Sequence, residues 1–110
     1  MMDIRQLTDE MNRFVTSKDW YEENSPRPQT ARNLAISLAL EAAEVLEHYQ
    51  WGEQPNSNVE LRGELADVAL YLLQLASVSG IDLETAILDK LQQNYKRTWD
   101  DSTTMEGGIS

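Results

Sequence analysis

The chain has 110 residues, which is enough for one domain with its own hydrophobic core. Its 19 acidic and 9 basic side chains give a formal charge of −10. So acidic a surface argues against a nucleic acid polymer or an anionic membrane as a partner. The absence of cysteine excludes disulfides and Cys-ligated zinc. No stretch resembles a signal peptide or is apolar over the ~20 residues that span a bilayer. We therefore expect a soluble, cytoplasmic protein.

The first half of the chain predicts two helices separated by a loop. Apolar residues recur at spacings of three and four over about residues 3–19, which indicates an amphipathic helix with Asp3 as its N-cap. A loop rich in turn-forming residues follows over 20–29. The second helix is expected over 30–50, with Thr30 as its N-cap.

The second half of the chain predicts two further helices. One is expected over 58–79 and ends at Gly80, a residue type that commonly terminates helices. The other is expected over 82–99. Helices joined by short connections are typical of an all-α, four-helix bundle-like fold. We expect residues 100–110 to form a flexible tail, because they offer little to bury.

The second and third helices each carry one narrow polar strip on an otherwise apolar surface. At 100° per residue, each strip is roughly 80° wide. The strip on the second helix consists of Asn33, Ser37, Glu41, Glu44 and His48. The strip on the third helix consists of Glu60, Glu64, Asp67, Tyr71 and Gln74. Because four short helices cannot cover two mostly apolar ones, we expect a homo-oligomer.

The two strips contain paired carboxylates, Glu41 with Glu44 and Glu64 with Asp67. The members of each pair are three residues apart and point the same way from adjacent turns. One such pair is usually no more than a solvated face. Four facing carboxylates, however, repel one another unless a cation lies between them, and hard divalent cations prefer oxygen ligands. The combination predicts a Mg²⁺ site, for which Mn²⁺ is a possible substitute.

The segments LEAAEVLEHYQW and GELADVALYLLQLA resemble the short MazG-like branch of the all-α nucleotide pyrophosphohydrolases, the branch that includes dCTP pyrophosphatases. Its signature, a Glu-x-x-Glu helix followed by a Glu-x-x-Asp helix, corresponds to the two carboxylate pairs. The resemblance covers roughly residues 3–99 and implies one catalytic domain over 1–99. It implies Mg²⁺-dependent hydrolysis of nucleoside triphosphates to a monophosphate and pyrophosphate, usually to clear surplus or non-canonical nucleotides. It also implies assembly as a dimer or a tetramer.

The resemblance and the chemistry together assign roles to individual residues. Four carboxylates are the expected metal ligands: Glu41, Glu44, Glu64 and Asp67. The candidates for the catalytic base are Glu41, Glu44 and Glu47, although Glu47 fits a surface residue equally well. The expected substrate-binding residues are Trp20, Asn33, Trp51 and Tyr71 at the base or sugar, and Asn94, Lys96 and Arg97 at the phosphates. The cations near residue 97 are equally typical of residues that complement a helix dipole.

Two sequence features bear on the base preference and on the kind of metal. Gln29 and Thr30 stand where dCTP-hydrolysing relatives often carry a histidine, which argues against a strict dCTP preference. His48 is the only histidine, whereas a di-iron carboxylate site needs two Glu-x-x-His motifs. We therefore disfavour redox iron and expect His48 to be peripheral.

Two alternatives stay open at this point. The chain is also compatible with a non-enzymatic helical interaction or regulatory module, in which the carboxylate strips would bind a basic partner. A second enzymatic alternative is hydrolysis of another pyrophosphate-containing metabolite, such as phosphoribosyl-ATP, on which related all-α enzymes act.

Overall fold

The structure is a computed structural model that describes residues 1–97. This part of the chain forms helices and no strand: α1 (Ile4–Ser17), α2 (Ala31–Glu47), α3 (Asn58–Val78) and α4 (Leu83–Lys96). The prediction of an all-α fold is confirmed for these residues, and the second helix ends three residues earlier than expected. Residues 98–99 of the predicted fourth helix, and the predicted tail at 100–110, lie outside the described residues.

Side-chain capping explains where the helices begin. Asp3 closes a capping box on α1, in which its carboxylate accepts from the Gln6 N–H and the Gln6 side chain accepts from the Asp3 N–H, both at 2.8 Å. Thr30 caps α2 by accepting from the backbone N–H of Asn33 at 3.1 Å. Both predicted N-caps are therefore confirmed. Ser57 caps α3 in the same way.

A glycine corner ends α3 and sets the direction of α4. Gly80 has a φ of +70°, a left-handed conformation that residues with a Cβ adopt at a cost. Its N–H donates to the carbonyl of Ser77 at 3.1 Å, and the N–H of Ile81 donates to the carbonyl of Ala76 at 2.9 Å. This pair of bonds is a Schellman motif. Beyond it the axis of α4 is bent by 102° from that of α3.

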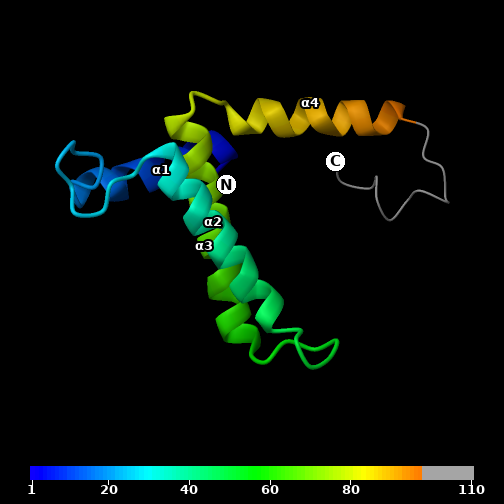
Figure 1. Cartoon of the computed structure of the whole chain (residues 1–110). Helices are drawn as coiled ribbons and strands as arrows, with labels where there is room; N and C mark the ends of the chain where they lie inside the picture. The colour runs from blue at the N-terminus through cyan, green and yellow to red at the C-terminus, as the bar shows by residue number, and fades with distance from the viewer. Residues whose placement is uncertain (98–110) are drawn as a thin grey trace.

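The helices form a hairpin, a crossing helix and an arm (Figure 1). α2 runs antiparallel along α3, α1 crosses one end of α3, and α4 extends away from that end. The core lies where these elements meet. Met11 and Val15 of α1 pack with Leu73 of α3, and Trp20 and Leu83 pack against this cluster.

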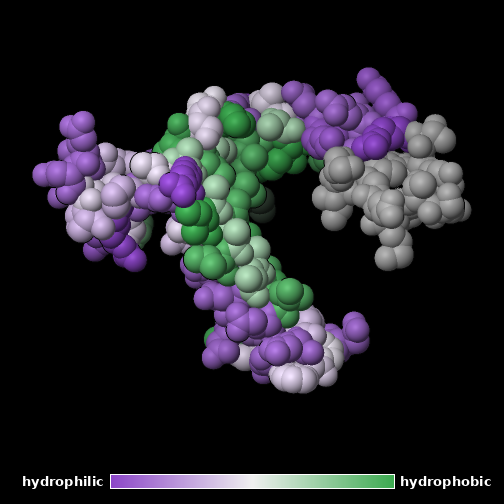
Figure 2. Space-filling model, viewed as in Figure 1, coloured by the Kyte–Doolittle hydropathy of each residue, from purple (hydrophilic) through white to green (hydrophobic). Residues whose placement is uncertain are grey.

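The bundle is open within a single chain. No side chain of α4 is buried within residues 1–97, and α2 and α3 expose many apolar residues along the hairpin. Figure 2 shows apolar side chains gathered on the upper part of the hairpin and around the corner to α4. Within residues 1–97, no single helix is long and apolar enough to cross a membrane, although α3 and α4 meet that requirement together as a bent pair.

Arg5 joins the start of α1 to the start of α4. Its guanidinium lies 2.7 Å from Oδ2 of Asp82 and 2.6 Å from Oε2 of Glu84. The hydrogen bond from Arg5 lowers the pKa of Asp82 below its usual value of 3.8. A carboxylate with a lowered folded-state pKa stabilises the fold above its usual pKa, and this contribution is lost as the pH falls through the lowered value.

We therefore expect Arg5→Met to lower the melting temperature slightly at pH 7 and to have a smaller effect at a pH below the lowered pKa of Asp82, where this carboxylate is protonated. Arg13→Met is the matched control, because the ion pair of Arg13 with Glu10, at 2.7 Å, lies within α1 and joins no second helix. Thermal unfolding followed by circular dichroism at both pH values checks this. An equal loss at both would contradict the ion-pair explanation.

Candidate functional site

The two predicted polar strips face each other along the α2–α3 hairpin. His48, at the end of α2, contacts Glu64 near the start of α3, and Asn33, near the start of α2, lines the same cavity as Gln74, near the end of α3. We call this facing pair of strips the polar seam. Its members are Asn33, Ser37, Glu41, Glu44 and His48 of α2 and Glu60, Glu64, Asp67, Tyr71 and Gln74 of α3. The seam has an acidic half toward the hairpin loop and an aromatic half toward α1.

The acidic half gathers the four predicted metal ligands around Glu41. Burial raises the pKa of Glu41 most, followed by its hydrogen bond with Glu44. The negative charges of Glu44, Asp67 and Glu64 raise the pKa further. Oε2 of Glu41 is buried and has no hydrogen-bond partner among residues 1–97. Glu41 is therefore the point of the seam where negative charge is least compensated.

The donor set of this acidic half suits a hard divalent cation. All four side chains offer carboxylate oxygens, and an unpartnered buried oxygen surrounded by like charges is relieved by a cation. Within residues 1–97, no three Asp, Glu or His side chains already stand in positions that hold a metal ion. The residues thus have the chemistry that Mg²⁺ prefers, and side-chain rotations are needed to bring their oxygens onto one ion.

An acidic cavity of about 270 Å³ opens at the hairpin-loop end of the seam. Its lining residues are Glu44, Glu47, His48, Asn56, Glu60 and Glu64. Glu47, the predicted alternative for the catalytic base, therefore lies next to two of the predicted ligands. It is exposed, which suits a proton acceptor that exchanges with solvent.

A second cavity, of about 300 Å³, lies at the aromatic half of the seam. The loop before α2 forms one wall, and α2 and α3 form the others. Its lining residues are Trp20, Pro26, Arg27, Pro28, Gln29, Asn33, Leu34, Ser37, Tyr71 and Gln74. Three residues predicted to bind the base or sugar, namely Trp20, Asn33 and Tyr71, therefore meet at one place.

Trp20 is held in the wall of this cavity by neighbours on two elements. The ring of Phe14 packs edge-on against it at 5.6 Å between centroids, and the Arg27 guanidinium lies 5.0 Å from the centre of its ring. Asn33 donates from Nδ2 to the carbonyl of Pro28 at 3.1 Å, which ties the loop to α2. The ring is thus positioned before any ligand is present.

The sequence predicts no role for a pair of amides that meets in this cavity. Gln74 is 5% exposed, and its Nε2 donates to Oε1 of Gln29 at 2.5 Å. The available signal was the position of Gln74 on the polar strip, one turn beyond Tyr71, on an otherwise apolar stretch of helix. The sequence pattern does not identify Gln29 as the partner of Gln74, because Gln29 lies 45 residues earlier in a loop.

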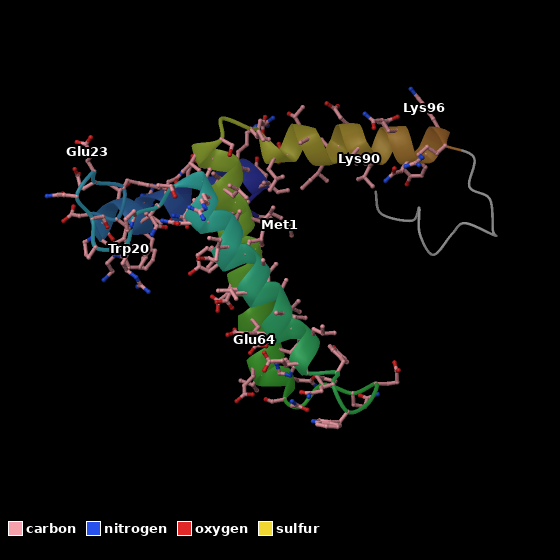
Figure 3. All side chains as sticks on the ribbon, in the orientation of Figure 1. Met1, Trp20, Glu23, Glu64, Lys90 and Lys96 are labelled. Carbon is pink, nitrogen blue, oxygen red and sulfur yellow. The ribbon has the colours of Figure 1, made fainter. Side chains whose placement is uncertain are left out.

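The structure does not bring the remaining predicted residues to the seam within one chain. Trp51 lies in the hairpin loop and is 86% exposed. Asn94, Lys96 and Arg97 lie at the far end of α4, and Figure 3 shows Lys96 well away from Glu64. Any phosphate contact from these α4 residues to a seam must therefore involve a different arrangement from that of one isolated chain.

Comparison with known proteins identifies the family. The model of the MazG-like family matches residues 36–107, a range that includes both carboxylate pairs. The chain belongs to the MazG-like family. The structure of this MazG-like chain is also similar to the crystal structure of a pyrophosphatase from Archaeoglobus fulgidus DSM 4304, with a TM-score of 0.66 and 30% sequence identity. That similarity covers 86% of this chain and 90% of the archaeal one.

Curated relatives of this MazG-like chain include enzymes that are named for nucleotide substrates. Human dCTP pyrophosphatase 1 is 35% identical over 104 residues, which covers 86% of this chain and 56% of the human protein. A dATP/dGTP diphosphohydrolase of Salmonella phage PMBT28 is 49% identical over 37 residues, which covers 34% of this chain and 13% of that protein. The chain spans about half the length of the dCTP pyrophosphatases that it matches.

Proposed function

We propose that this MazG-like protein is a Mg²⁺-dependent nucleoside triphosphate pyrophosphohydrolase that converts (d)NTPs to monophosphates and pyrophosphate. The observation that carries the proposal is the polar seam, which joins a carboxylate cluster to a cavity with an aromatic wall. Asn33 and Glu41 mark its two halves on α2, and their spacing of eight residues corresponds to about 12 Å. This separation suits a nucleotide with its base beside Trp20 and its phosphates at the carboxylates.

The reaction is attack of water on the α-phosphorus. The bond from this phosphorus to the oxygen that bridges to the β-phosphorus breaks, and the bridging oxygen leaves with pyrophosphate. The ligands would be Glu41, Glu44, Glu64 and Asp67, and bound Mg²⁺ supplies neutralisation of phosphate charge and a lowered pKa for a coordinated water. A seam carboxylate accepts the proton of the attacking water, and the candidates are Glu41, Glu44 and Glu47.

Both the lining of the cavity and the names of the relatives support the proposed substrate class. The ring face of Trp20 and the side chain of Tyr71 suit stacking against any nucleobase, because every base has a π-face. Gln29, Asn33 and Gln74 add amides, which both donate and accept hydrogen bonds. The relatives are named for dCTP and for dATP and dGTP, which supports deoxynucleoside triphosphates as a class rather than a single base. We propose nucleotide-pool cleaning as the role.

Product analysis tests this function. The purified protein is incubated with a panel of NTPs and dNTPs, with and without Mg²⁺, and the products are separated. We expect monophosphate and pyrophosphate in the presence of Mg²⁺ only, and the ranking of the panel gives the base preference. Release of orthophosphate and a diphosphate, or no turnover of any nucleotide with Mg²⁺, would overturn the proposal.

We also propose that the protein functions as a homo-oligomer. The large exposed apolar side chains of α4 lie within an arc of about 100°: Ile87, Leu88, Leu91 and Tyr95. An exposed apolar face of this size is typical of an interface. A second copy packed on α4 would cover this face, and it would also determine which seam the cations at the end of α4 approach.

A further inference from the structure

His48 is the most deeply buried residue of the acidic half, with 4% of its surface exposed. Its Nε2 lies 2.6 Å from Oε2 of Glu64. Its Nδ1 is buried and has no hydrogen-bond partner within the described part of the chain. Since buried polar atoms are normally paired, the single bond to Glu64 is the interaction that orients this ring.

The surroundings of the two ring nitrogens define which of them carries the proton. A carboxylate oxygen accepts, so Nε2 of His48 must be the donor. An unpartnered Nδ1 is tolerated best as a bare lone pair, because an unpaired buried N–H is costly. A ring with its proton on Nε2 therefore fits this site. In that form the ring donates to one oxygen of Glu64.

The backbone holds His48 where this bond joins two helices. The residue is the C-cap of α2, and its N–H donates to the carbonyl of Val45 at 3.2 Å. Glu64 lies on α3, lines the acidic cavity and keeps a quarter of its side chain exposed. One oxygen of Glu64 is thus tied to a buried donor on the neighbouring helix, while the side chain still reaches the cavity.

We propose that His48 is a positioning residue for the metal site. By donating from Nε2 to Oε2 of Glu64, it fixes the carboxylate in the orientation that presents Oε1 to the divalent cation. The inference rests on the proposed function, because Glu64 is one of the proposed ligands. It also revises the expectation that His48 is peripheral. Groups that hold metal ligands in place commonly account for 10- to 100-fold in metal affinity.

Two substitutions of His48 distinguish the effect of its hydrogen-bond donor from the effect of its side-chain volume. Glutamine places an N–H close to the position of Nε2, whereas leucine fills similar space and offers no donor. Binding of Mn²⁺ to the nucleotide-free protein is measured by isothermal titration calorimetry. We expect His48→Leu to weaken Mn²⁺ binding by about 10- to 100-fold and His48→Gln to stay close to wild type. Tyr49→Phe, at the exposed neighbouring position, is the matched control and should leave binding unchanged.

Circular dichroism without metal confirms that each variant is folded. If His48→Leu does not fold, His48→Asn replaces it, because its amide is too short to reach Glu64. Wild-type Mn²⁺ affinity in the variant without the donor overturns the inference, and so does an equal loss in this variant and in His48→Gln. Two other outcomes would contradict the proposed metal site itself, on which this inference rests. They are absence of Mn²⁺ binding by the wild type and unchanged Mn²⁺ binding by Glu64→Gln.

Discussion

Glu41→Gln is expected to reduce pyrophosphate release by about a thousandfold and, in metal-free protein, to raise the melting temperature. The first effect follows because a metal ligand at a phosphoryl site is worth several kcal/mol of transition-state stabilisation, and about 4 kcal/mol corresponds to that factor. The second follows because the substitution removes a partly buried charge that lies among Glu44, Glu64 and Asp67. Turnover assays and thermal unfolding in a chelator measure the two effects.

The gain in stability should depend on pH. The folded-state pKa of Glu41 is raised above its usual value of 4.5, so its ionisation at neutral pH destabilises the fold. Protonation removes this penalty as the pH falls through the raised pKa, so the variant and the wild type should converge in melting temperature toward acid pH. Glu23→Gln is the control, because Glu23 lies in the exposed loop far from Glu64 (Figure 3). A melting temperature below that of the wild type at pH 7 would contradict the repulsion argument.

Adding Asp67→Asn to Glu41→Gln tests whether the same carboxylates bind the ion. A ligand that binds only the folded state stabilises it in proportion to the logarithm of its concentration. We expect Mg²⁺ to raise the melting temperature of the wild type and to leave that of the double variant unchanged. A regulatory module that binds a basic protein through this face would show no such dependence on Mg²⁺.

Leu91→Asp is expected to convert the proposed oligomer into smaller species. Leu91 is 48% exposed and lies at the centre of the apolar face of α4. Burying a leucine side chain contributes about 1.5–3 kcal/mol, and a symmetric interface contains the residue twice, so self-association should weaken by about 10²- to 10⁴-fold. Size-exclusion chromatography with light scattering measures the mass as a function of protein concentration.

The control for Leu91→Asp introduces the same negative charge on a different face of α4. Gln93 is exposed on the opposite side of α4, about 180° from the apolar face. Gln93→Asp adds the same negative charge and should leave the mass of the oligomer unchanged. A wild-type protein that is monomeric at assay concentrations, or an equal effect of both substitutions, would contradict the proposal that this face is the interface.

The features predicted correctly from the sequence depend on local or periodic signals. Asp3 and Thr30 cap helices by bonding to backbone groups three residues away, and Gly80 supplies the left-handed conformation at the end of α3. These interactions are complete within a few residues. The facing of Glu41 and Asp67 was also predictable, because helical periodicity places each on its strip and a short connection makes the two helices antiparallel.

The features that were not predicted depend on how distant elements are aligned. The bond between His48 and Glu64 requires the exact register of the hairpin, and the pairing of Gln29 with Gln74 requires the path of a loop. The direction of α4 follows from the dihedral angles of one corner. A helical pattern shows which face of α4 is apolar and contains no information on where the helix points, so the separation of Lys96 from Glu64 could not be predicted.

The glycine corner at the end of α3 makes α4 a lever. Fourteen residues at 1.5 Å per residue give an arm about 21 Å long, so a rotation of 10° at Gly80 displaces its far end by about 4 Å. Substitutions in the short turn before Leu83 would therefore move the basic end of the arm by more than the length of a hydrogen bond while leaving every residue of the seam in place. In proteins built on this plan, the geometry of assembly can diverge through the corner alone, independently of the chemistry between α2 and α3.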